Sequence, residues 1–358
     1  MNVRLVRFLD RYIGSAICFV LGLLPKQKFG KTDKILAIQL WGIGESILTL
    51  PALNEPENVK VLVTERNKDV YNGYHEVEVI ATNPIPIIKY IMKNRNKYDA
   101  VIDFEEYLNI SAIISFFVGR RRIGYSHGIR SRLYTDTVEY NDGQHCSQTF
   151  MDLLKPLGVE RKVKELLPLK YHHNEKRVVE KYLHSNSIGK KDFLVAVAVG
   201  VGESAKSRIW PIENFARLAN MLVQKRKAKI IFIGSKDDEE LNDSVENLMR
   251  EGSINAAGEF TLPQTACLIR RCSLVISNDS GPMHIAAAMG TKTIGLFGPN
   301  IPARFGPLKG ISVYKGEICK YSPCINVHKG EIPNCYFRGE DYQKCMKNIS
   351  VEDVTSRI

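Results

Sequence analysis

The chain has 358 residues, of which 44% are hydrophobic and 25% are charged. This is the composition of a globular protein, long enough for two domains, and it argues against disorder. The formal net charge of +11 favours acidic partners such as a phosphorylated ligand or an anionic membrane surface. No pattern of a nucleic-acid-binding module is present, so nucleic acid is not an expected partner.

Residues 13–24, IGSAICFVLGLL, form an apolar run that is too short to span a bilayer and lacks a signal-cleavage site. Basic residues flank this run on both sides: Arg4, Arg7, Arg11, Lys26, Lys28 and Lys31. The pattern predicts an amphipathic helix within residues 1–30 that lies on an anionic membrane surface. A terminal helix that caps a domain core is the alternative. Both fit a cytoplasmic location, the first as a peripheral protein on the inner face of the cytoplasmic membrane.

From Lys34 onward, short apolar runs alternate with amphipathic stretches, which predicts βαβ units and parallel sheets. The strands expected in the first half are 34–40, 59–64, 76–80, 98–104 and 121–125. The helices expected between them are 42–53, 86–94 and 110–119. A charged stretch, 160–191, is poor in strand formers and is expected to lead into the second half.

A second α/β series follows this stretch. Its expected strands are 193–200, 228–234, 273–277 and 291–298, and its expected helices are 211–226, 238–250, 262–271 and 282–289. The sequence therefore predicts two α/β domains of similar size, at 31–175 and 176–358, facing each other across a linker.

One segment, NDSGPMHIAAAMGTKTIGLFGP (Asn278–Pro299), directly follows a short buried strand. Pro282 suits the first position of a helix, and Asp279 or Ser280 can cap it. A helix N-terminus favours an anion, and His284 in the first turn can hydrogen-bond a phosphate or a sugar hydroxyl. The alternative is a capped helix without a ligand.

A second segment, GVGESAKSRIWP (Gly200–Pro211), contains G-x-G-x-x-A, a weak match to the dinucleotide fingerprint. The fingerprint requires its glycines to open a helix, but here the next helix is expected only at Pro211. A polar loop with Lys206 and Arg208 lies between. We expect this loop to contact a diphosphate; a solvated charged loop is the alternative.

A third segment, LWGIGESILTLPAL, covers residues 40–53. Gly42 and Gly44 allow a tight turn from strand to helix and place Glu45 at the helix start, at the carboxyl edge of the first sheet. A carboxylate there can cap the helix or act as a general base. Ile47 stands where the dinucleotide fingerprint needs its third glycine, which argues against a nicotinamide-dependent oxidoreductase.

Four late cysteines have the spacing C-x4-C-x10-C-x9-C: Cys319, Cys324, Cys335 and Cys345. This spacing does not match paired C-x2-C zinc ligands. Disulfides, an unusual metal site and buried structural thiols all remain open, and structural thiols are the simplest interpretation.

In their order along the chain, GIGESILTLPAL, KSRIWPIENFARLA and SNDSGPMHIAAAMGTKTIGLFGP resemble motifs of the bacterial ADP-heptose:lipopolysaccharide heptosyltransferases, glycosyltransferase family 9. The likeness extends over residues 33–350 and includes Cys345, Met346 and Ile349 near its end. It implies a GT-B fold, with two Rossmann-like domains of which the second holds most of the nucleotide sugar. It also implies an inverting, metal-independent and cofactor-free transfer of heptose from ADP-heptose to the lipid-anchored inner core of lipopolysaccharide.

The resemblance also implies roles for individual residues. Those expected to bind the ADP-sugar are Asp279, Ser280, Gly281 and His284, with Arg208 and Lys206 at the diphosphate. An acidic residue after Gly234 would meet the ribose; Asp237, Asp238 and Glu239 are available, and Asp238 is our candidate.

Glu45 stands where members of the family commonly have aspartate, and the resemblance makes it the general base, with Gly42 and Gly44 beside the substrate. Asp103 and Glu105 are the next candidates for the base. A related transferase with another nucleotide sugar or acceptor remains an alternative, because its pocket motifs would look the same. A noncatalytic nucleotide-sugar-binding protein is a further alternative, because Glu45 departs from the usual aspartate.

Overall fold

The computed structural model describes residues 8–25 and 32–358, and the chain forms two compact units. The first unit comprises Met1–Val163 and Val327–Gly330, and the second comprises Lys164–Asn326 and Glu331–Ile358. The change of unit comes after Val163, twelve residues before the boundary at residue 175 that was expected from the sequence. Residues after Val163 already pair within the second unit, because Glu165 forms an ion pair of 2.6 Å with Lys309.

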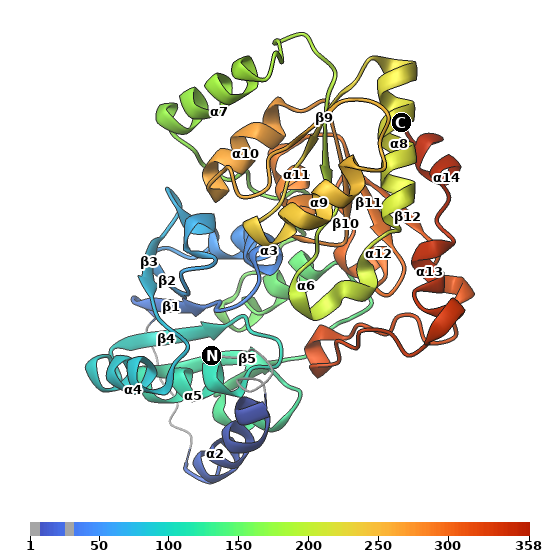
Figure 1. Cartoon of the computed structure of the whole chain (residues 1–358). Helices are drawn as coiled ribbons and strands as arrows, with labels where there is room; N and C mark the ends of the chain where they lie inside the picture. The colour runs from blue at the N-terminus through green and yellow to red at the C-terminus, as the bar shows by residue number, and fades with distance from the viewer. Residues whose placement is uncertain (1–7, 26–31) are drawn as a thin grey trace. The chain divides into compact units, whose positions relative to one another are not determined.

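The first unit is built on a parallel sheet with strand order β3-β2-β1-β4-β5-β6 (Figure 1). The strands are β1 (Ile35–Ile38), β2 (Val59–Val63), β3 (Glu76–Val79), β4 (Tyr98–Asp103), β5 (Gly119–Tyr125) and β6 (Asp136–Val138). The helices are α3 (Ile43–Leu53), α4 (Pro84–Lys93), α5 (Asn109–Val118) and α6 (Cys146–Asp152), with short 3-10 turns η2 (Lys68–Tyr71), η3 (Ile129–Leu133) and η4 (Lys155–Leu157). Every residue of β1 is buried, as expected for a central strand of a parallel sheet covered on both faces.

Helices α4 and α5 cover one face of this sheet, and α3 covers the other (Figure 1). Ile87 of α4 and Ile114 of α5 pack against Leu36, Leu62 and Val101 of the strands in one apolar cluster. The isoleucines of α4 and α5 thus supply the apolar contacts that hold these helices to the sheet.

The N-terminal segment packs on α5. It consists of a π-helical turn, η1 (Asp10–Gly14), followed by α2 (Ser15–Leu21). The carboxylate of Asp10 accepts hydrogen bonds from the backbone N–H groups of Asn109 (3.0 Å) and Ile110 (2.8 Å), where α5 begins. Cys18 is fully buried and belongs to the same cluster as Ala112 of α5. An acidic side chain at a helix N-terminus is electrostatically favourable, so this contact anchors the segment.

The remainder of the predicted segment 1–30, at residues 1–7 and 26–30, lies outside the described residues. Within the parts of the chain that the structure describes, none of the helices combines the length and the apolarity needed to cross a bilayer.

The second unit is built on a parallel sheet with strand order β12-β11-β10-β7-β8-β9. The strands are β7 (Leu194–Ala198), β8 (Lys229–Phe232), β9 (Ser253–Asn255), β10 (Leu274–Asn278), β11 (Thr293–Phe297) and β12 (Ile311–Tyr314). The helices are α7 (His173–Ser185), α8 (Ile212–Arg226), α9 (Glu239–Glu246), α10 (Leu262–Arg271), α11 (Gly281–Met289), α12 (Pro302–Phe305), α13 (Lys344–Lys347) and α14 (Val351–Thr355). The prediction of two parallel-sheet α/β domains is confirmed.

The C-terminal segment completes the core of the second unit. The indole Nε1 of the fully buried Trp210 donates a hydrogen bond of 2.8 Å to the carbonyl oxygen of Ile349. A side chain at Gly298 would meet the sulfur atoms of Cys345 and Met346, each at 2.8 Å. The late motif noticed in the sequence is therefore part of the packing that holds this unit together.

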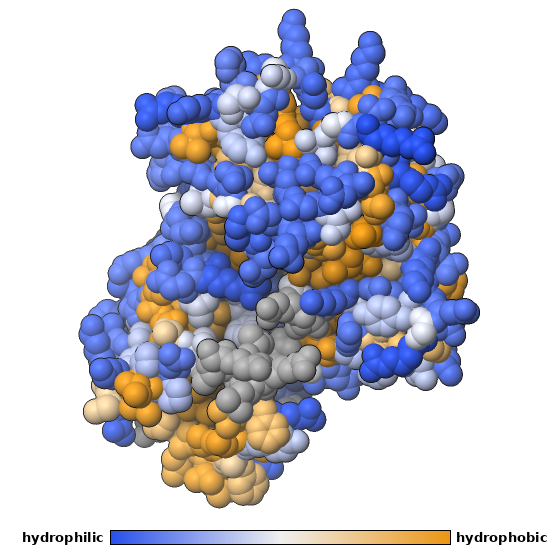
Figure 2. Space-filling view, viewed as in Figure 1, coloured by the Kyte–Doolittle hydropathy of each residue, from blue (hydrophilic) through white to orange (hydrophobic). Residues whose placement is uncertain are grey.

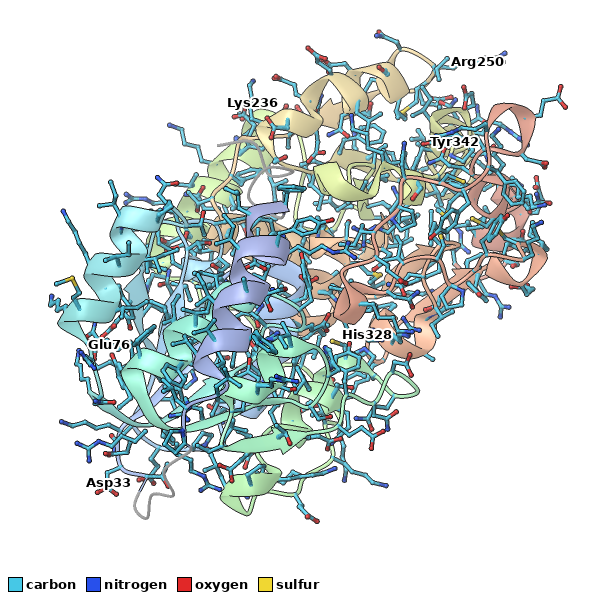
Figure 3. The ribbon with its side chains drawn as sticks, turned by 90° about the horizontal axis from the view of Figure 1, so that it is seen from below. Asp33, Glu76, Lys236, Arg250, His328 and Tyr342 are labelled. Carbon is cyan, nitrogen blue, oxygen red and sulfur yellow. The ribbon has the colours of Figure 1, made fainter. Side chains whose placement is uncertain are left out.

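A four-residue excursion, Val327–Gly330, returns from the second half of the chain to the first unit. The ring of His328 (labelled in Figure 3) stacks on Tyr140 with a centroid distance of 4.5 Å and an interplanar angle of 14°. It also meets the ring of His127 edge-on at 6.0 Å. We call these four residues the return segment.

Candidate active site

Asn278 ties together the loops at the carboxyl edge of the second sheet. This residue ends β10 and is fully buried. Its Nδ2 donates to the carbonyl oxygen of Val199 after β7 (2.7 Å), and its Oδ1 accepts from the backbone N–H of Trp210 (3.1 Å). Strand β7 lies between β10 and β8, and the strand order reverses beside it. Such a topological switch point is where open α/β sheets bind ligands. Asn278 thus holds both ends of the loop between Val199 and Trp210, which carries Lys206 and Arg208.

Asp279, the next residue, holds the basic side chain predicted for the diphosphate. Its Oδ2 lies 3.1 Å from Nη1 of Arg208 and accepts a second hydrogen bond of 3.1 Å from Nδ2 of Asn300. Asp279 and Asn300 are buried, whereas the side chain of Arg208 is 20% exposed. The Nε of Arg208 is buried and has no hydrogen-bond partner among the described residues. The guanidinium is therefore fixed at one nitrogen and retains a donor for a ligand.

Helix α11 begins directly after these residues, at Gly281. Ser280 occupies the N-cap position, but its side chain makes no capping hydrogen bond. From the sequence, Asp279 or Ser280 was expected to cap this helix. The structure instead pairs Asp279 with Arg208 and places Ser280 Oγ 3.2 Å from Ser277 Oγ. His284 lies in the first turn and is 4% exposed. A helix N-terminus without a side-chain cap favours an anion.

The loop between β7 and α8 carries the other predicted basic residue. Residues Glu203–Arg208 form a short 3-10 helix, η5, after Gly202, and α8 begins only at Ile212, so the glycines do not open an α-helix. The side chain of Lys206 is exposed, while its carbonyl oxygen accepts a hydrogen bond of 2.8 Å from Nε2 of Gln343. This is the arrangement of a basic loop, not of a dinucleotide fingerprint.

Asp238 is the acidic residue that lies against this edge of the second sheet. Its Oδ2 accepts from both the backbone N–H and the hydroxyl of Ser235, each at 2.8 Å. A Cβ built on Gly200 would lie 1.9 Å from its Oδ1, so the carboxylate packs directly against the backbone at the end of β7. By contrast, Asp237 is exposed and Glu239 pairs with Lys236 at 2.6 Å.

Glu45 lies in the first turn of α3 in the first unit. Gly42 is the N-cap of this helix, and a Cβ built on Gly42 would lie only 1.7 Å from Oε2 of Glu45. The side chain therefore curls back over the glycine turn. Within the described parts of the chain, the Glu45 carboxylate forms no hydrogen bond or ion pair, and it remains partly exposed. Gly44, inside the turn, is buried.

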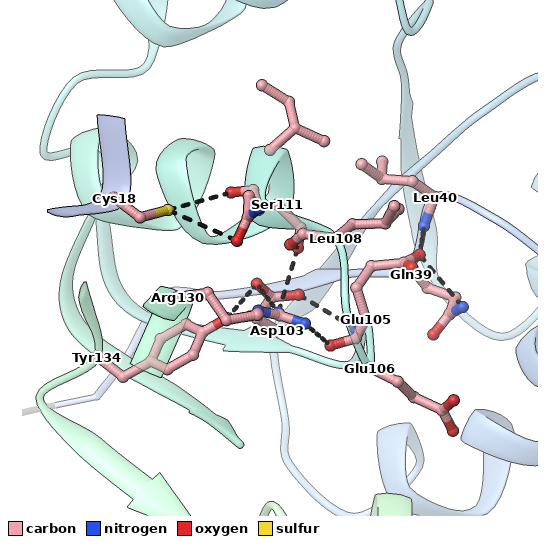
Figure 4. Close-up of polar contacts among 12 residues, drawn as sticks. Cys18, Gln39, Leu40, Asp103, Glu105, Glu106, Leu108, Ser111, Arg130 and Tyr134 are labelled. Atoms are coloured by element: carbon pink, nitrogen blue, oxygen red, sulfur yellow. Dashed lines mark hydrogen bonds and ion pairs between the residues drawn. The ribbon is translucent and has the colours of Figure 1, made fainter. Parts of the chain in front are cut away.

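Asp103, one of the two alternative bases, has a structural role (Figure 4). It is fully buried, and its Oδ2 lies 2.7 Å from both Nη2 of Arg130 and the hydroxyl of Tyr134. Arg130 is itself buried; burial alone would lower its pKa, but the neighbouring Asp103 carboxylate reverses this and raises it. A buried ion pair with this many partners is unsuited to exchange protons with a substrate.

Glu105, the second alternative, holds the backbone that leads into the glycine turn (Figure 4). Its Oε1 accepts hydrogen bonds from the backbone N–H groups of Leu40 (2.5 Å) and Trp41 (3.0 Å). Burial, assisted by the Asp103 carboxylate, raises the pKa of Glu105 to about 8. Of the three carboxylates proposed from the sequence as a base, Glu45 is the one that lies free of structural bonds to the described residues.

The four late cysteines line one small pocket of the second unit together with aromatic residues, among them Tyr321 and Phe337. All four are free thiols. Burial raises the pKa of Cys324 to about 11 and of Cys345 to about 12, so both remain protonated near neutral pH. Residues 8–25 and 32–358 contain no group of three or more His, Cys, Asp or Glu placed to hold a metal ion.

Two residues that position this site were not identified as functional from the sequence, Asn278 and Asn300. The only signal was that Asn278 ends a strand within the quoted motif, and that Asn300 follows the Gly-Pro at the end of that motif. Their bonds link positions 68, 79 and 21 residues apart, which no local pattern encodes.

Polar residues thus gather where β7, β8, β10 and β11 end, at the switch point of a Rossmann-like sheet, and a second such sheet carries Glu45 after its central strand β1. Two Rossmann-like domains in one chain are the architecture of the GT-B class. The sequence model described as glycosyltransferase family 9 (heptosyltransferase) matches residues 90–331, which is more than half of the chain. The chain belongs to this family, as its motifs predict.

Individual proteins agree with this assignment. The chain is 30% identical to lipopolysaccharide heptosyltransferase 2 of Salmonella typhimurium over 207 residues, 55% of this chain and 59% of the relative. Matches to the first two curated relatives cover 38% and 59% of their lengths, less than two thirds in each case.

Two solved structures share the fold. A glycosyl transferase family 9 protein from Veillonella parvula has a TM-score of 0.75 at 22% identity, covering 93% of this chain and 97% of its own. The E. coli heptosyltransferase WaaC with ADP has a TM-score of 0.63 at 17% identity, covering 90% and 98%.

Proposed function

We propose that this protein is a heptosyltransferase that moves a heptose from ADP-heptose to the inner core of lipopolysaccharide, with inversion and without a metal. One observation carries the proposal: Arg208 is held by the buried Asp279 beside the uncapped N-terminus of α11, and its Nε has no partner among the described residues. That arrangement suits a diphosphate. The proposal of heptose as the transferred sugar rests on the family to which the chain belongs.

The proposed donor site has different residues for the diphosphate and for the ribose. The guanidinium of Arg208 and the amides of α11 supply positive potential for the diphosphate, with exposed Lys206 in the same loop. Asp238 lies against the end of β7 with Oδ1 beside Gly200, within the edge where a ribose hydroxyl would be recognised. A relative structure described as containing ADP is consistent with this arrangement.

The transfer step requires a base for the acceptor hydroxyl. In the mechanism we propose, the Glu45 carboxylate takes the hydroxyl proton, and the acceptor oxygen forms a bond to the anomeric carbon of the heptose. The bond from that carbon to the diphosphate oxygen breaks on the opposite face, and ADP leaves with its new charge stabilised by Arg208. Glu45 suits this role because no described residue engages its carboxylate.

Substitution of Glu45 by Gln tests the reaction. The amide has nearly the same size but cannot accept a proton at neutral pH, so turnover should fall roughly 100-fold or more. Affinity for ADP and the melting temperature should not change, and Glu45→Asp should keep part of the activity. Near-normal turnover of the Gln variant would remove Glu45 as the base.

Calorimetry with ADP, UDP, GDP and NAD tests the donor. Arg208→Ala should weaken ADP binding by about 1–3 kcal/mol, as expected for a charge-assisted contact, and His284→Ala should also weaken it. Arg226→Ala, on the exposed end of α8, is the matched control and should bind as wild type. Tighter binding of another nucleotide would mean that ADP-heptose is not the donor. Unchanged ADP affinity in Arg208→Ala would mean that the nucleotide binds elsewhere.

We further propose that the N-terminal segment holds the enzyme on the anionic inner face of the cytoplasmic membrane, where its lipid-anchored acceptor would be found. Large apolar side chains of this segment face solvent: Phe8, Tyr12, Ile13, Ile17, Phe19, Val20, Leu23 and Leu24. Figure 2 shows an orange patch over α2. The opposite side of the segment is anchored through Asp10 and Cys18. Exposed apolar side chains gathered in this way typify a membrane contact.

Substitution on the exposed side is a sharper test than deletion, because the other side packs on α5. Val20→Ser/Leu23→Ser, at positions 62% and 69% exposed, should reduce binding to phosphatidylglycerol vesicles without lowering the melting temperature. Wild-type protein that ignores such vesicles at low salt would disprove membrane binding.

A further inference from the structure

We propose that the outer face of α4 is a second membrane contact of the first unit, made to an anionic phospholipid bilayer. This inference rests on the membrane part of the proposed function and extends it from the N-terminal segment to an element that the sequence analysis treats as an ordinary helix of the fold. The observations are the exposure, the charge and the placement of α4.

The exposed side chains of α4 form an apolar stripe. Ile85, Ile88 and Met92 are 67%, 57% and 74% exposed. Their spacing of three and four residues places them on one face of the helix. The opposite face, with Ile87 and Ile91, packs into the core of the first unit. Helix α4 is therefore apolar on two sides, although a helix at the surface of a soluble protein needs only its inner side to be apolar.

Charge selects the partner for this stripe. Lys89, Lys93, Arg95 and Lys97 are all exposed on α4 or just after it. The sequence from residue 81 to residue 98 contains no acidic residue. Lys97 lies 3.6 Å from Glu78, while Lys89 and Lys93 form no ion pair with any residue in the described ranges. An apolar stripe bordered by basic side chains is the pattern of helices that lie in the interface of an anionic bilayer.

The placement of α4 makes the contact compatible with the N-terminal segment. Both α4 and α2 pack against α5, on the same side of the first sheet. Figure 2 shows a second orange patch over α4, to the left of the patch over α2. A single helix on a bilayer leaves the domain free to rotate about that helix, whereas two separate contacts define a plane. The pair would therefore fix the orientation of the first unit at the membrane.

A second copy of the chain is a poorer occupant. In a two-fold symmetric contact through α4, the stripe of one copy would face the same stripe of the other, and Lys89 and Lys93 would approach their own counterparts. The resulting repulsion disfavours that contact, whereas the same charges favour a surface of phosphatidylglycerol.

Flotation of the full chain with phosphatidylcholine vesicles, with and without phosphatidylglycerol, tests the inference. Ile85→Gln/Ile88→Gln/Met92→Gln should lower the partition coefficient roughly tenfold or more, because three apolar side chains no longer enter the interface. Val178→Gln/Leu248→Gln, at exposed apolar positions of the second unit, is the matched control and should bind as wild type. The melting temperature of both variants should stay unchanged, since all five positions are exposed.

The charges give an independent readout. Lys89→Gln/Lys93→Gln should reduce binding roughly tenfold or more on vesicles with phosphatidylglycerol, and little on phosphatidylcholine alone. An equal effect on both kinds of vesicle would contradict a role for anionic headgroups.

The possible failures can be told apart. If Val20→Ser/Leu23→Ser weakens binding while the α4 variant binds as wild type, the inference on α4 is wrong and the N-terminal contact remains. If the wild type does not bind at all, both membrane proposals are wrong, and glycosyl transfer is judged separately with a water-soluble acceptor. If light scattering shows a dimer that the α4 variant converts to a monomer without a change in vesicle binding, the stripe is a self-association surface and the inference is overturned.

Discussion

Replacement of Gly42 by alanine should displace the Glu45 carboxylate without destabilising the turn that carries it. A Cβ at Gly42 would lie 1.7 Å from Oε2 and 2.7 Å from Cδ of Glu45. The backbone at Gly42, with φ of −69° and ψ of 144°, is extended and open to alanine. The change therefore meets a side chain and not a strained backbone.

The size of the effect follows from these contacts. Ordinary van der Waals contact begins at 3.4 Å, so Oε2 must move by about 1.7 Å to make room for the methyl group. Because the displaced atom ends a flexible side chain, unfolding free energy should change by no more than about 1 kcal/mol. A misplacement of about 1 Å at a reacting group can cost roughly 100-fold in rate, so we expect at least that loss of turnover in Gly42→Ala.

The assay measures ADP release with saturating donor and acceptor, alongside urea unfolding of the same protein. Gly252→Ala is the control, because no described atom beyond its two chain neighbours lies within 4 Å of a Cβ built there. Turnover of Gly42→Ala near that of the control would refute the idea that this glycine positions the base. A large loss of stability would instead show that Gly42 is needed for the fold.

Three further predictions concern groups with defined partners. Burial raises the pKa of Glu105 from its usual value near 4.5 to about 8, so between these pH values the folded state binds more protons than the unfolded state. The free energy of unfolding of the wild type should therefore fall as the pH rises through this range. In urea unfolding, Glu105→Gln should flatten this dependence on pH. Asn278→Ala leaves the carbonyl of Val199 and the N–H of Trp210 without their partner, and should cost at least about 2 kcal/mol in the same measurement; a smaller loss would mean that water replaces the amide. Asp10→Ala removes the carboxylate at the start of α5 and should cost about 1 kcal/mol, with faster hydrogen exchange at 10–21; unchanged exchange there would show that Cys18 and its neighbours suffice as an anchor.

The central, apolar strands of both sheets could be predicted from the sequence. Three of the edge strands could not. Strands β1, β4, β7 and β10 are runs of buried side chains that stand out from their surroundings. The missed strands are β6, β9 and β12, which have three or four residues and are largely half-buried at the sheet edges. A run this short carries too few alternations to be recognised.

For the candidate site, the sequence identified residues but not their contacts. Glu45, Arg208 and Asp279 could be found because each stands next to a glycine turn, a Trp-Pro pair or a strand end. What each side chain does with its charge could not be found, because that depends on distant partners. Asp279 was a candidate cap in the sequence but is an ion-pair partner in the structure, and Asp103 and Glu105 were candidate bases but are buried supports.

The return segment has a consequence for the order in which the chain matures during synthesis. The ribosome releases the first unit up to Val163 early, yet Val327–Gly330 emerges only after most of the second unit has been made. Domains generally fold as units and the N-terminal one first, but here the ring of His328 cannot reach Tyr140 until that late point. The first unit therefore gains the contacts of His328 with Tyr140 and His127 only after Gly330 has been added to the chain. Completion of the first unit thus depends on elongation as well as on its own folding.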